Sequence, residues 1–241
     1  MKSILLSFGF LFGTICVFAG WYKCSTYQGQ IAGARVHVYL QFRDINATSN
    51  DTIPVSGVYR YDNYNDPIEL RGILLKNKSL QLTEFHGNTR FAELNFQWQD
   101  KSLHGLWQSD RKSYKVSLTR IGSLSDIENQ GTNEPTEILI GSSFKDEYLI
   151  GVYYKDLHDS RARLLELRIF DKKTNELRQV ITFDKKDMPA GNVSTIIFSA
   201  VLARENLDKR ERSIEIDEDD GRMGQSLFMT YNHETNQFIE D

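Results

Sequence analysis

Apolar residues recur at every second position through most of residues 27–121. This alternation is typical of β-strands with one face toward a core, because successive side chains on a strand point to opposite faces. Turn signals such as Asp62-Asn63 and Gly87-Asn88 separate the runs, which favours antiparallel neighbours. The sequence therefore predicts an antiparallel meander that closes into a barrel-like sheet over residues 20–121. One run illustrates the pattern, with a predicted inward row of Val36, Val38, Leu40 and Phe42 and a predicted water-facing row of Arg35, His37, Tyr39 and Gln41.

The remainder of the chain predicts a linker and a second, smaller β-rich domain. Residues 122–136 are rich in Ser, Asn, Gly and acidic residues and lack a sustained apolar period, which is typical of a linker. Residues 137–241 are strand-rich, and the pattern of residues 170–177 recurs at 231–238, which predicts two similar hairpins whose Asx and Asn residues supply the turns. Residues 199–209 are also compatible with one short helix. The predicted fold class is all-β, with at most that helix.

The N-terminus has the features of a signal peptide. Lys2 precedes an apolar run over residues 4–18, and the small Ala19 predicts cleavage before Gly20. The run is short for a membrane span, so a retained anchor is the less favoured alternative. We therefore expect residues 1–19 to be removed and the protein to be periplasmic or secreted in a bacterium, with no membrane span. Cys24 would then be the remaining thiol, either buried or paired with another chain.

The composition disfavours nucleic-acid binding and catalysis. The formal net charge is −4, and no basic stripe is present to neutralise phosphates. The sequence contains no His-Glu-x-x-His, phosphate-loop, Gly-x-Ser-x-Gly or Cys-x-x-Cys pattern. Its five histidines are scattered. We therefore expect a protein that binds rather than catalyses, although distant residues that converge on a metal or catalytic site would escape this reading.

Glu84 is expected to point into the barrel, since it shares parity with Leu80 and Leu82. A buried carboxylate is costly unless it is hydrogen-bonded or paired. It could be a polar anchor in a barrel cavity that Trp98 and Trp107 also line, as in a carrier of a small apolar ligand or lipid. It could equally be paired in a structural role.

The acidic run at 211–220 carries six carboxylates and one arginine. Three interpretations remain open: a solvated loop, a surface that attracts a basic partner, and a calcium site. The candidate calcium ligands are Asp217, Asp219 and Asp220, before Gly221, although their spacing does not match an EF-hand loop. No other cofactor is expected.

The two halves of the chain resemble known bacterial proteins. Residues 27–31, 57–61, 68–72, 80–84 and 105–107 are similar to the repeated patterns of a bacterial exported β domain. Residues 170–179, 217–221 and 227–238 resemble the hairpin, Asp-rich loop and closing hairpin of periplasmic immunity proteins that neutralise peptidoglycan-cleaving toxins, related in shape to lysozyme inhibitors. Asn175 stands where that family has Gly, and its Asn-Phe-Asp-Gly-Tyr core is missing. Ser56-Gly57-Val58-Tyr59 is also similar to a loop that some lysozyme inhibitors insert into the enzyme.

The resemblance implies an exported, non-catalytic inhibitor of a basic peptidoglycan hydrolase or lysozyme-like effector. An acidic scaffold would attract such an enzyme electrostatically and could block its cleft. The expected contact surface is an acidic loop with neighbouring hairpin residues, namely Glu215, Asp217, Asp219, Asp220, Gly221, Asp171 and Lys172.

Overall fold

The computed structural model describes residues 22–43, 51–62, 64–99, 101–127, 132–157, 159, 161–184, 188–219 and 224–241. In these residues the chain forms strands joined by turns and contains no helix, which confirms the predicted all-β class. The described residues accordingly include no helix that is long and apolar enough to cross a membrane. The predicted signal peptide, residues 1–19, lies outside them.

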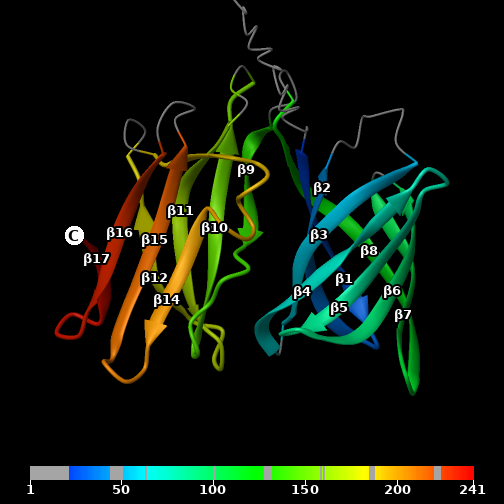
Figure 1. Cartoon of the computed structure of the whole chain (residues 1–241), viewed down its shortest axis with the longest axis horizontal. Helices are drawn as coiled ribbons and strands as arrows, with labels where there is room; N and C mark the ends of the chain where they lie inside the picture. The colour runs from blue at the N-terminus through cyan, green and yellow to red at the C-terminus, as the bar shows by residue number, and fades with distance from the viewer. Residues whose placement is uncertain are drawn as a thin grey trace, which may run out of the picture.

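The first eight strands close into an antiparallel barrel, as the alternation predicts (Figure 1). Each strand pairs with the next one along the chain, and β8 returns to pair with β1. This order needs no long crossover, because antiparallel neighbours can be joined by short connections. The strands are β1 (Tyr22–Ile31), β2 (Ala34–Arg43), β3 (Thr52–Tyr61), β4 (Tyr64–Leu75), β5 (Ser79–His86), β6 (Thr89–Gln99), β7 (Ser102–Ser109) and β8 (Lys112–Ser125).

Side chains from all eight strands fill the barrel. An eight-stranded barrel is just wide enough for its own side chains to occupy the interior. Among the described residues the interior is therefore a packed apolar core and not an open ligand chamber. Its buried members are Tyr27, Ile31, Val36, Val38, Leu40, Phe42, Val55, Tyr59, Ile68, Leu70, Leu74, Leu80, Leu82, Ala92, Leu94, Phe96, Leu103, Trp107, Val116 and Leu118.

Glycines allow neighbouring strands of the barrel to approach closely, most tightly at Gly72 and Gly105. A Cβ atom added to Gly72 would lie 1.8 Å from the carbonyl oxygen of Gln81, and one added to Gly105 would lie 1.9 Å from that of Asn95. Both obstacles are backbone atoms, which cannot swing aside as a flexible side chain can. The glycines of the Leu-x-Gly and Gly-x-Trp patterns thus serve the close packing of strands.

We expect Gly72→Ala to lower the free energy of unfolding by about 1–3 kcal/mol, because β4 and β5 must move apart to admit the methyl group. Urea-induced unfolding followed by circular dichroism measures the change. Gly191→Ala is the matched control, since the nearest atom to its added Cβ is the Thr195 hydroxyl oxygen at an ordinary 3.6 Å. Equal stability of the two variants would contradict the prediction.

The later strands form a sandwich of two sheets beside the barrel (Figure 1). The middle sheet has the order β12-β11-β10-β9, and β13 also pairs with β11. The outer sheet has the order β14-β15-β16-β17 and packs on the other side of the middle sheet from the barrel. The strands are β9 (Thr132–Leu139), β10 (Glu147–Lys155), β11 (Arg161–Asp171), β12 (Leu177–Thr182), β13 (Ala190–Asn192), β14 (Val201–Asn206), β15 (Glu211–Asp219), β16 (Gly224–Asn232) and β17 (Gln237–Glu240).

The barrel and the sandwich share one core. Strand β10 is a nearly continuous apolar run that is buried along its length, as expected of a strand covered on both faces. One apolar cluster joins Cys24, Tyr39, Val58 and Leu124 of the barrel to sandwich residues such as Leu149. We call this contact the shared core. The two domains are therefore packed together and not merely tethered.

The outward row of β2 differs from its prediction. Arg35 is exposed and His37 is half-buried, but Tyr39 and Gln41 are only 2% and 5% exposed. Tyr39 belongs to the shared core, and the Gln41 side-chain amide donates to the carbonyl oxygen of Ser194 at 2.6 Å. The period of two shows which residues share a face of a strand but not whether another domain covers that face.

Cys24 is a free thiol in the shared core. Its burial raises the pKa of the thiol to about 12, so the thiol stays protonated and unreactive. Of the two states left open by the sequence, the structure shows the buried one.

The predicted linker, residues 122–136, is strand at both ends. Residues 122–125 complete β8 and pair with β1, and residues 132–136 begin β9 and pair with β10. Polar side chains are compatible with strands at these positions because pairing satisfies the backbone groups and one face meets solvent.

The short helix considered at 199–209 is not formed. Residues 201–206 are strand β14, in which Val201 and Ala203 pair with Ile216 and Ile214 of β15. Alternating side chains that pack on the sandwich core outweigh the helix propensity of this segment, since tertiary contacts routinely override propensity.

The two hairpins predicted from the internal repeat are confirmed, and their turns share one design. Asn175 and Asn236 adopt left-handed φ angles of 59° and 56°. Asp171 and Asn232 each use Oδ1 to accept hydrogen bonds from the backbone N–H groups two and three residues later, at 2.7–3.2 Å. The Asx and Asn residues therefore supply the turn conformations, as the repeat predicts.

Candidate functional site

Glu84 is buried inside one end of the barrel, with 2% of its surface exposed, as its place in the alternation predicts. Its Oε2 accepts hydrogen bonds from the Tyr59 hydroxyl at 2.6 Å and from the Trp107 indole N–H at 2.8 Å. Its Oε1 lies 2.8 Å from Nε2 of His86. These partners offset the desolvation of the carboxylate, which would otherwise be costly.

The Glu84 network connects the barrel core to the surface. Burial, together with the neighbouring charge of Glu84, raises the pKa of Tyr59, so its hydroxyl stays protonated and can donate. The His86 side chain is 48% exposed, so its ring links the buried carboxylate to solvent. Sequence reasoning missed Tyr59 and His86. The available signal for His86 is that it follows Glu84 by two residues, so both side chains lie on the same face of β5.

Trp98, the third residue expected to line a cavity with Glu84, lies toward the other end of the barrel. Its ring centroid is 6.1 Å from that of Phe42, and its backbone N–H donates to the carbonyl oxygen of Lys78 in the β4–β5 turn. Glu84 sits instead at the opposite end of β5. The structure thus joins Glu84 to Trp107 but not to Trp98.

The acidic run is largely a strand and not a loop. Residues 211–219 form β15, which pairs with β14 on one side and β16 on the other. Ile214 and Ile216 are buried in the sandwich, so Glu215 and Asp217 point to the opposite, solvent-facing side. The Ile-x-Ile alternation was the available signal for this strand.

The calcium prediction stays a prediction. The described residues include no group of three or more His, Cys, Asp or Glu side chains placed to hold a metal ion. Asp217 accepts a hydrogen bond from the Ser226 hydroxyl at 2.8 Å. The Asp219 side chain, Asp220 and Gly221 lie outside the described residues.

Asp171 and Lys172 have structural partners. Arg178, at 2.7 Å, and the backbone N–H groups of the turn hold the pKa of Asp171 well below its usual range. Lys172 forms an ion pair with Asp66 of the barrel and donates to the carbonyl oxygen of Phe144 at 2.6 Å. The hairpin residues therefore shape a turn and link the two domains.

The two halves of the predicted contact surface lie at opposite ends of the sandwich. Asp171 lies opposite Glu147 in the pairing of β11 with β10. Glu147 in turn forms an ion pair with Arg212, near the start of β15. Asp217 lies five residues farther along that strand, roughly 17 Å away at about 3.3 Å per residue. Strand β15 runs from the lower to the upper end of the sandwich in Figure 1. Asp171 and Lys172 are therefore not neighbours of Asp217.

The solvent-facing side of the outer sheet, which we call the outer face, combines apolar and acidic side chains. Strand pairing sets Phe228 opposite Glu215, and Ile239 opposite Thr230. Phe228 and Ile239 are 45% and 47% exposed. The two apolar side chains lie on β16 and on the edge strand β17, beside polar side chains of the same face. The acidic residues of this face are Glu211, Glu215, Asp217 and Asp241, and Arg204 pairs with Glu215.

In each edge strand of the outer sheet, one residue has its backbone groups hydrogen-bonded by a side chain from outside that sheet. The Ser142 hydroxyl accepts from the backbone N–H of Ala203 at 2.9 Å and donates to its carbonyl oxygen at 3.3 Å. The Gln179 amide bonds both backbone groups of Phe238 at 2.8 Å. Edge groups occupied in this way hinder the addition of a partner's strand.

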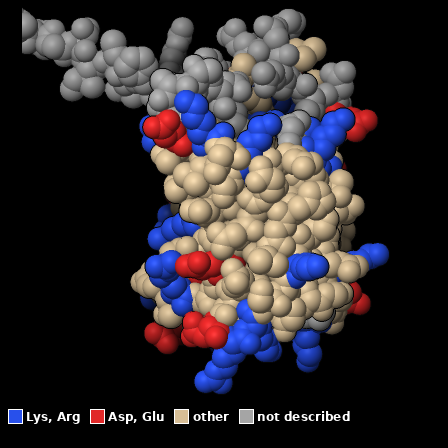
Figure 2. Space-filling model, turned by 90° about the vertical axis from the view of Figure 1, so that its right-hand side faces the viewer, with Lys and Arg blue, Asp and Glu red and all other residues tan. Residues whose placement is uncertain are grey.

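Charge is divided unequally between the two domains. Residues 22–127 contain 13 Lys and Arg against 10 Asp and Glu, a net charge of +3, whereas residues 128–241 contain 15 against 23, a net charge of −8. The barrel face in Figure 2, which is turned away from the sandwich, has a broad stretch with few charged side chains. The sandwich is the part of the molecule that would attract a basic protein.

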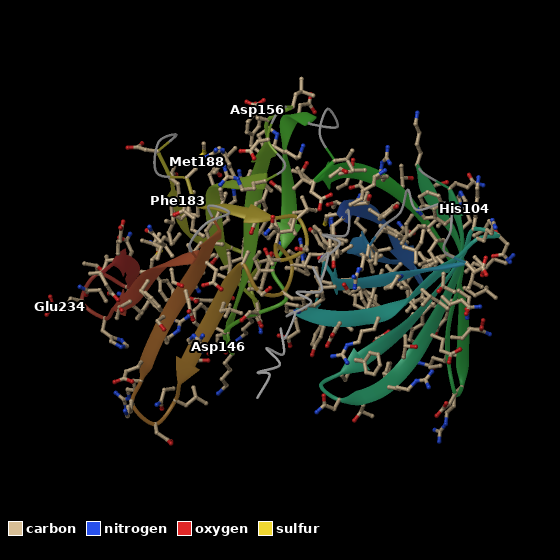
Figure 3. All side chains as sticks on the ribbon, turned by 45° about the horizontal axis from the view of Figure 1, so that its top comes forward. His104, Asp146, Asp156, Phe183, Met188 and Glu234 are labelled. Atoms are coloured by element: carbon tan, nitrogen blue, oxygen red, sulfur yellow. The ribbon has the colours of Figure 1, made fainter. Side chains whose placement is uncertain are left out.

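Within the part of the chain that the structure describes, the histidines do not converge on one site. His104 lies on the barrel, where its Nδ1 is 3.0 Å from the Ser117 hydroxyl oxygen. His233 lies in the β16–β17 turn, with its Nε2 3.0 Å from the carbonyl oxygen of Arg210. Figure 3 shows His104 and Glu234, the neighbour of His233, at opposite sides of the molecule.

No family model, no curated protein and no solved structure matches this chain.

Proposed function

We propose that the protein is an exported, non-catalytic binding protein whose outer face captures a basic partner, a lysozyme-like peptidoglycan hydrolase. The observation that carries the proposal is the outer face itself, where exposed Phe228 and Ile239 lie among carboxylates on a sheet with blocked edges. Exposed apolar side chains with charged neighbours are a common feature of protein interfaces.

The two kinds of side chain would have different roles in binding. The net charge of −8 on the sandwich would speed the approach of a basic protein and make association sensitive to salt. The exposed apolar side chains would supply most of the affinity once water is excluded. We choose a hydrolase as the partner because the second half of the chain resembles periplasmic immunity proteins and lysozyme inhibitors.

The Ser-Gly-Val-Tyr tetrapeptide does not contribute to this surface. Val58 lies in the shared core and Tyr59 lies inside the barrel, so neither can insert into an enzyme cleft. The proposal therefore differs from a loop-insertion mechanism. It places recognition on a sheet face at the other side of the molecule from the barrel.

We expect Phe228→Ala to weaken binding to a purified basic lysozyme by about tenfold to thirtyfold, or about 1.4–2 kcal/mol, because it removes a large apolar contact. Asp217→Asn should mainly slow association, with a smaller effect at high salt. Surface plasmon resonance with the full chain, across several salt concentrations, measures both effects.

Ile121→Ala is the matched control, since Ile121 is 52% exposed but lies on the barrel. If the folded protein binds neither the lysozyme nor any of several purified basic peptidoglycan hydrolases, the proposal is wrong. If the Phe228→Ala and Ile121→Ala variants bind with equal affinity, the outer face is not the contact surface.

A further inference from the structure

A β-bulge exposes an aromatic residue at the end of the barrel that contains Glu84, which we call the barrel mouth. Glu84 pairs with Ala92, but the next residue, Phe85, pairs with Arg90. Phe91 is therefore the extra residue of a bulge in β6. Bulges bend a strand and re-aim a side chain, and they occur often beside functional sites. Phe91 is 53% exposed at this position.

Phe91 is the outermost ring of an aromatic array that begins in the core. Its ring centroid lies 4.6 Å from that of His86 and 6.3 Å from that of Trp107, which stacks on Tyr114 at 5.6 Å. Hydrogen bonds to Glu84 fix the rings of His86 and Trp107. The buried carboxylate thus holds a rigid platform behind an exposed ring. A platform of this kind loses little conformational entropy when a ligand stacks on it.

A hollow of about 460 Å³ adjoins Phe91 and lies within the size range of small-molecule sites. Its lining combines apolar and polar side chains of β6 with polar side chains at the end of β7 and in the turn that follows. The Arg90 guanidinium and the Glu93 carboxylate pair at 3.0 Å, so their charges balance. The lining residues are Arg90, Phe91, Ala92, Glu93, Gln108, Ser109 and Asp110.

We propose that the barrel mouth binds a sugar ring of an uncharged glycan, with Phe91 as the stacking surface. The C–H groups of a pyranose ring carry partial positive charge and suit the negative face of an aromatic ring. The hydroxyl groups at its edge suit the Gln108 amide, the Ser109 hydroxyl and the Asp110 carboxylate, which together donate and accept.

Other ligand classes fit the barrel mouth less well. A nucleotide would also stack, but Glu93 and Asp110 would repel its phosphates. A purely apolar ligand would leave the polar lining without partners. The inference does not depend on the proposed function, because the barrel mouth and the outer face belong to different domains.

The test uses NMR of the full chain labelled with nitrogen-15, with chitotriose, cellotriose and maltotriose as probes. The indole N–H signal of Trp107, assigned through a Trp107→Phe variant, reports on the platform. We expect at least one trisaccharide to shift this signal in a saturable way. Phe91→Ala should weaken the affinity at least tenfold, and Phe91→Trp should retain it. The exposure of Phe91 makes a loss of folding in these variants unexpected.

Phe228→Ala is the control for this experiment, since it alters an exposed phenylalanine of the outer face and should leave glycan affinity unchanged. The inference is overturned if none of the three sugars moves the Trp107 signal at its solubility limit. It is equally overturned if Phe91→Ala binds a sugar as tightly as the unaltered protein. Either failure would leave the capture of a basic hydrolase by the outer face unaffected.

Discussion

Replacing Glu84 by leucine is expected to lower the free energy of unfolding by about 2–4 kcal/mol, because buried hydrogen-bond donors lose their acceptor at about 1–3 kcal/mol each. The substitution removes the acceptor for the Tyr59 hydroxyl and the Trp107 indole N–H, both buried at their contacts with the carboxylate. The Trp107 indole N–H would then be desolvated without this acceptor, which costs about 1–3 kcal/mol. The Tyr59 hydroxyl would keep only its hydrogen bond with Tyr61. Urea-induced unfolding, followed by tryptophan fluorescence and circular dichroism, measures the loss.

Glu84→Gln is the matched variant for this prediction and should cost far less. Its carbonyl oxygen can accept from Tyr59 and Trp107 as Oε2 does, and its amide can donate to Nε2 of a neutral His86. A double variant, Glu84→Leu with Tyr59→Phe, should recover part of the lost stability, since it removes one of the two donors that lose this acceptor. If Glu84→Leu matches the unaltered protein in stability, the network does not stabilise the barrel.

Arg212→Ala is expected to destabilise the sandwich by a comparable amount, about 3–5 kcal/mol. The Arg212 guanidinium lies 4.4 Å from the ring centroid of Phe144 and 4.7 Å from that of Tyr231. It also pairs with Glu147 and lies 3.6 Å from Glu205. Its removal would leave two partly buried carboxylates and a gap between the sheets. Thermal and urea-induced unfolding measure the effect.

Two further variants sharpen the Arg212 prediction. Arg212→Lys keeps the charge but loses the planar group that packs against the aromatic rings, so it should recover only part of the stability. Arg204→Ala is the control, because Arg204 pairs with Glu215 on the same sheet but its side chain is 60% exposed. Exposed pairs contribute about 0–1 kcal/mol. Similar losses at Arg212 and Arg204 would contradict a role for burial.

The sequence predicts the barrel and the inward position of Glu84, because both follow from a period of two along single strands. It does not predict the partners of Glu84. Tyr59 and Trp107 lie 25 and 23 residues away, and they reach the carboxylate only when the barrel curves and closes. The bulge at Phe91 is equally hidden, since one extra residue changes the register without changing the composition.

The candidate surface on the sandwich was predictable only in part. The acidic character of residues 211–220 is visible in the sequence, and Glu215 and Asp217 do face solvent on the outer face. Phe228 was not expected beside them, because its place opposite Glu215 depends on the pairing of β15 with β16. Asp171 belongs elsewhere for the same reason. The order of strands, which local patterns do not encode, decides which residues are neighbours.

The shared core has a consequence for how the chain reaches its finished state. Tyr39, Val58 and Leu124 become buried only when the middle sheet packs on the barrel. A chain that has completed its barrel but lacks the later strands therefore displays an adhesive patch that chaperones and proteases can recognise. Only the complete molecule buries this patch, so the sandwich is needed to protect the barrel from such recognition.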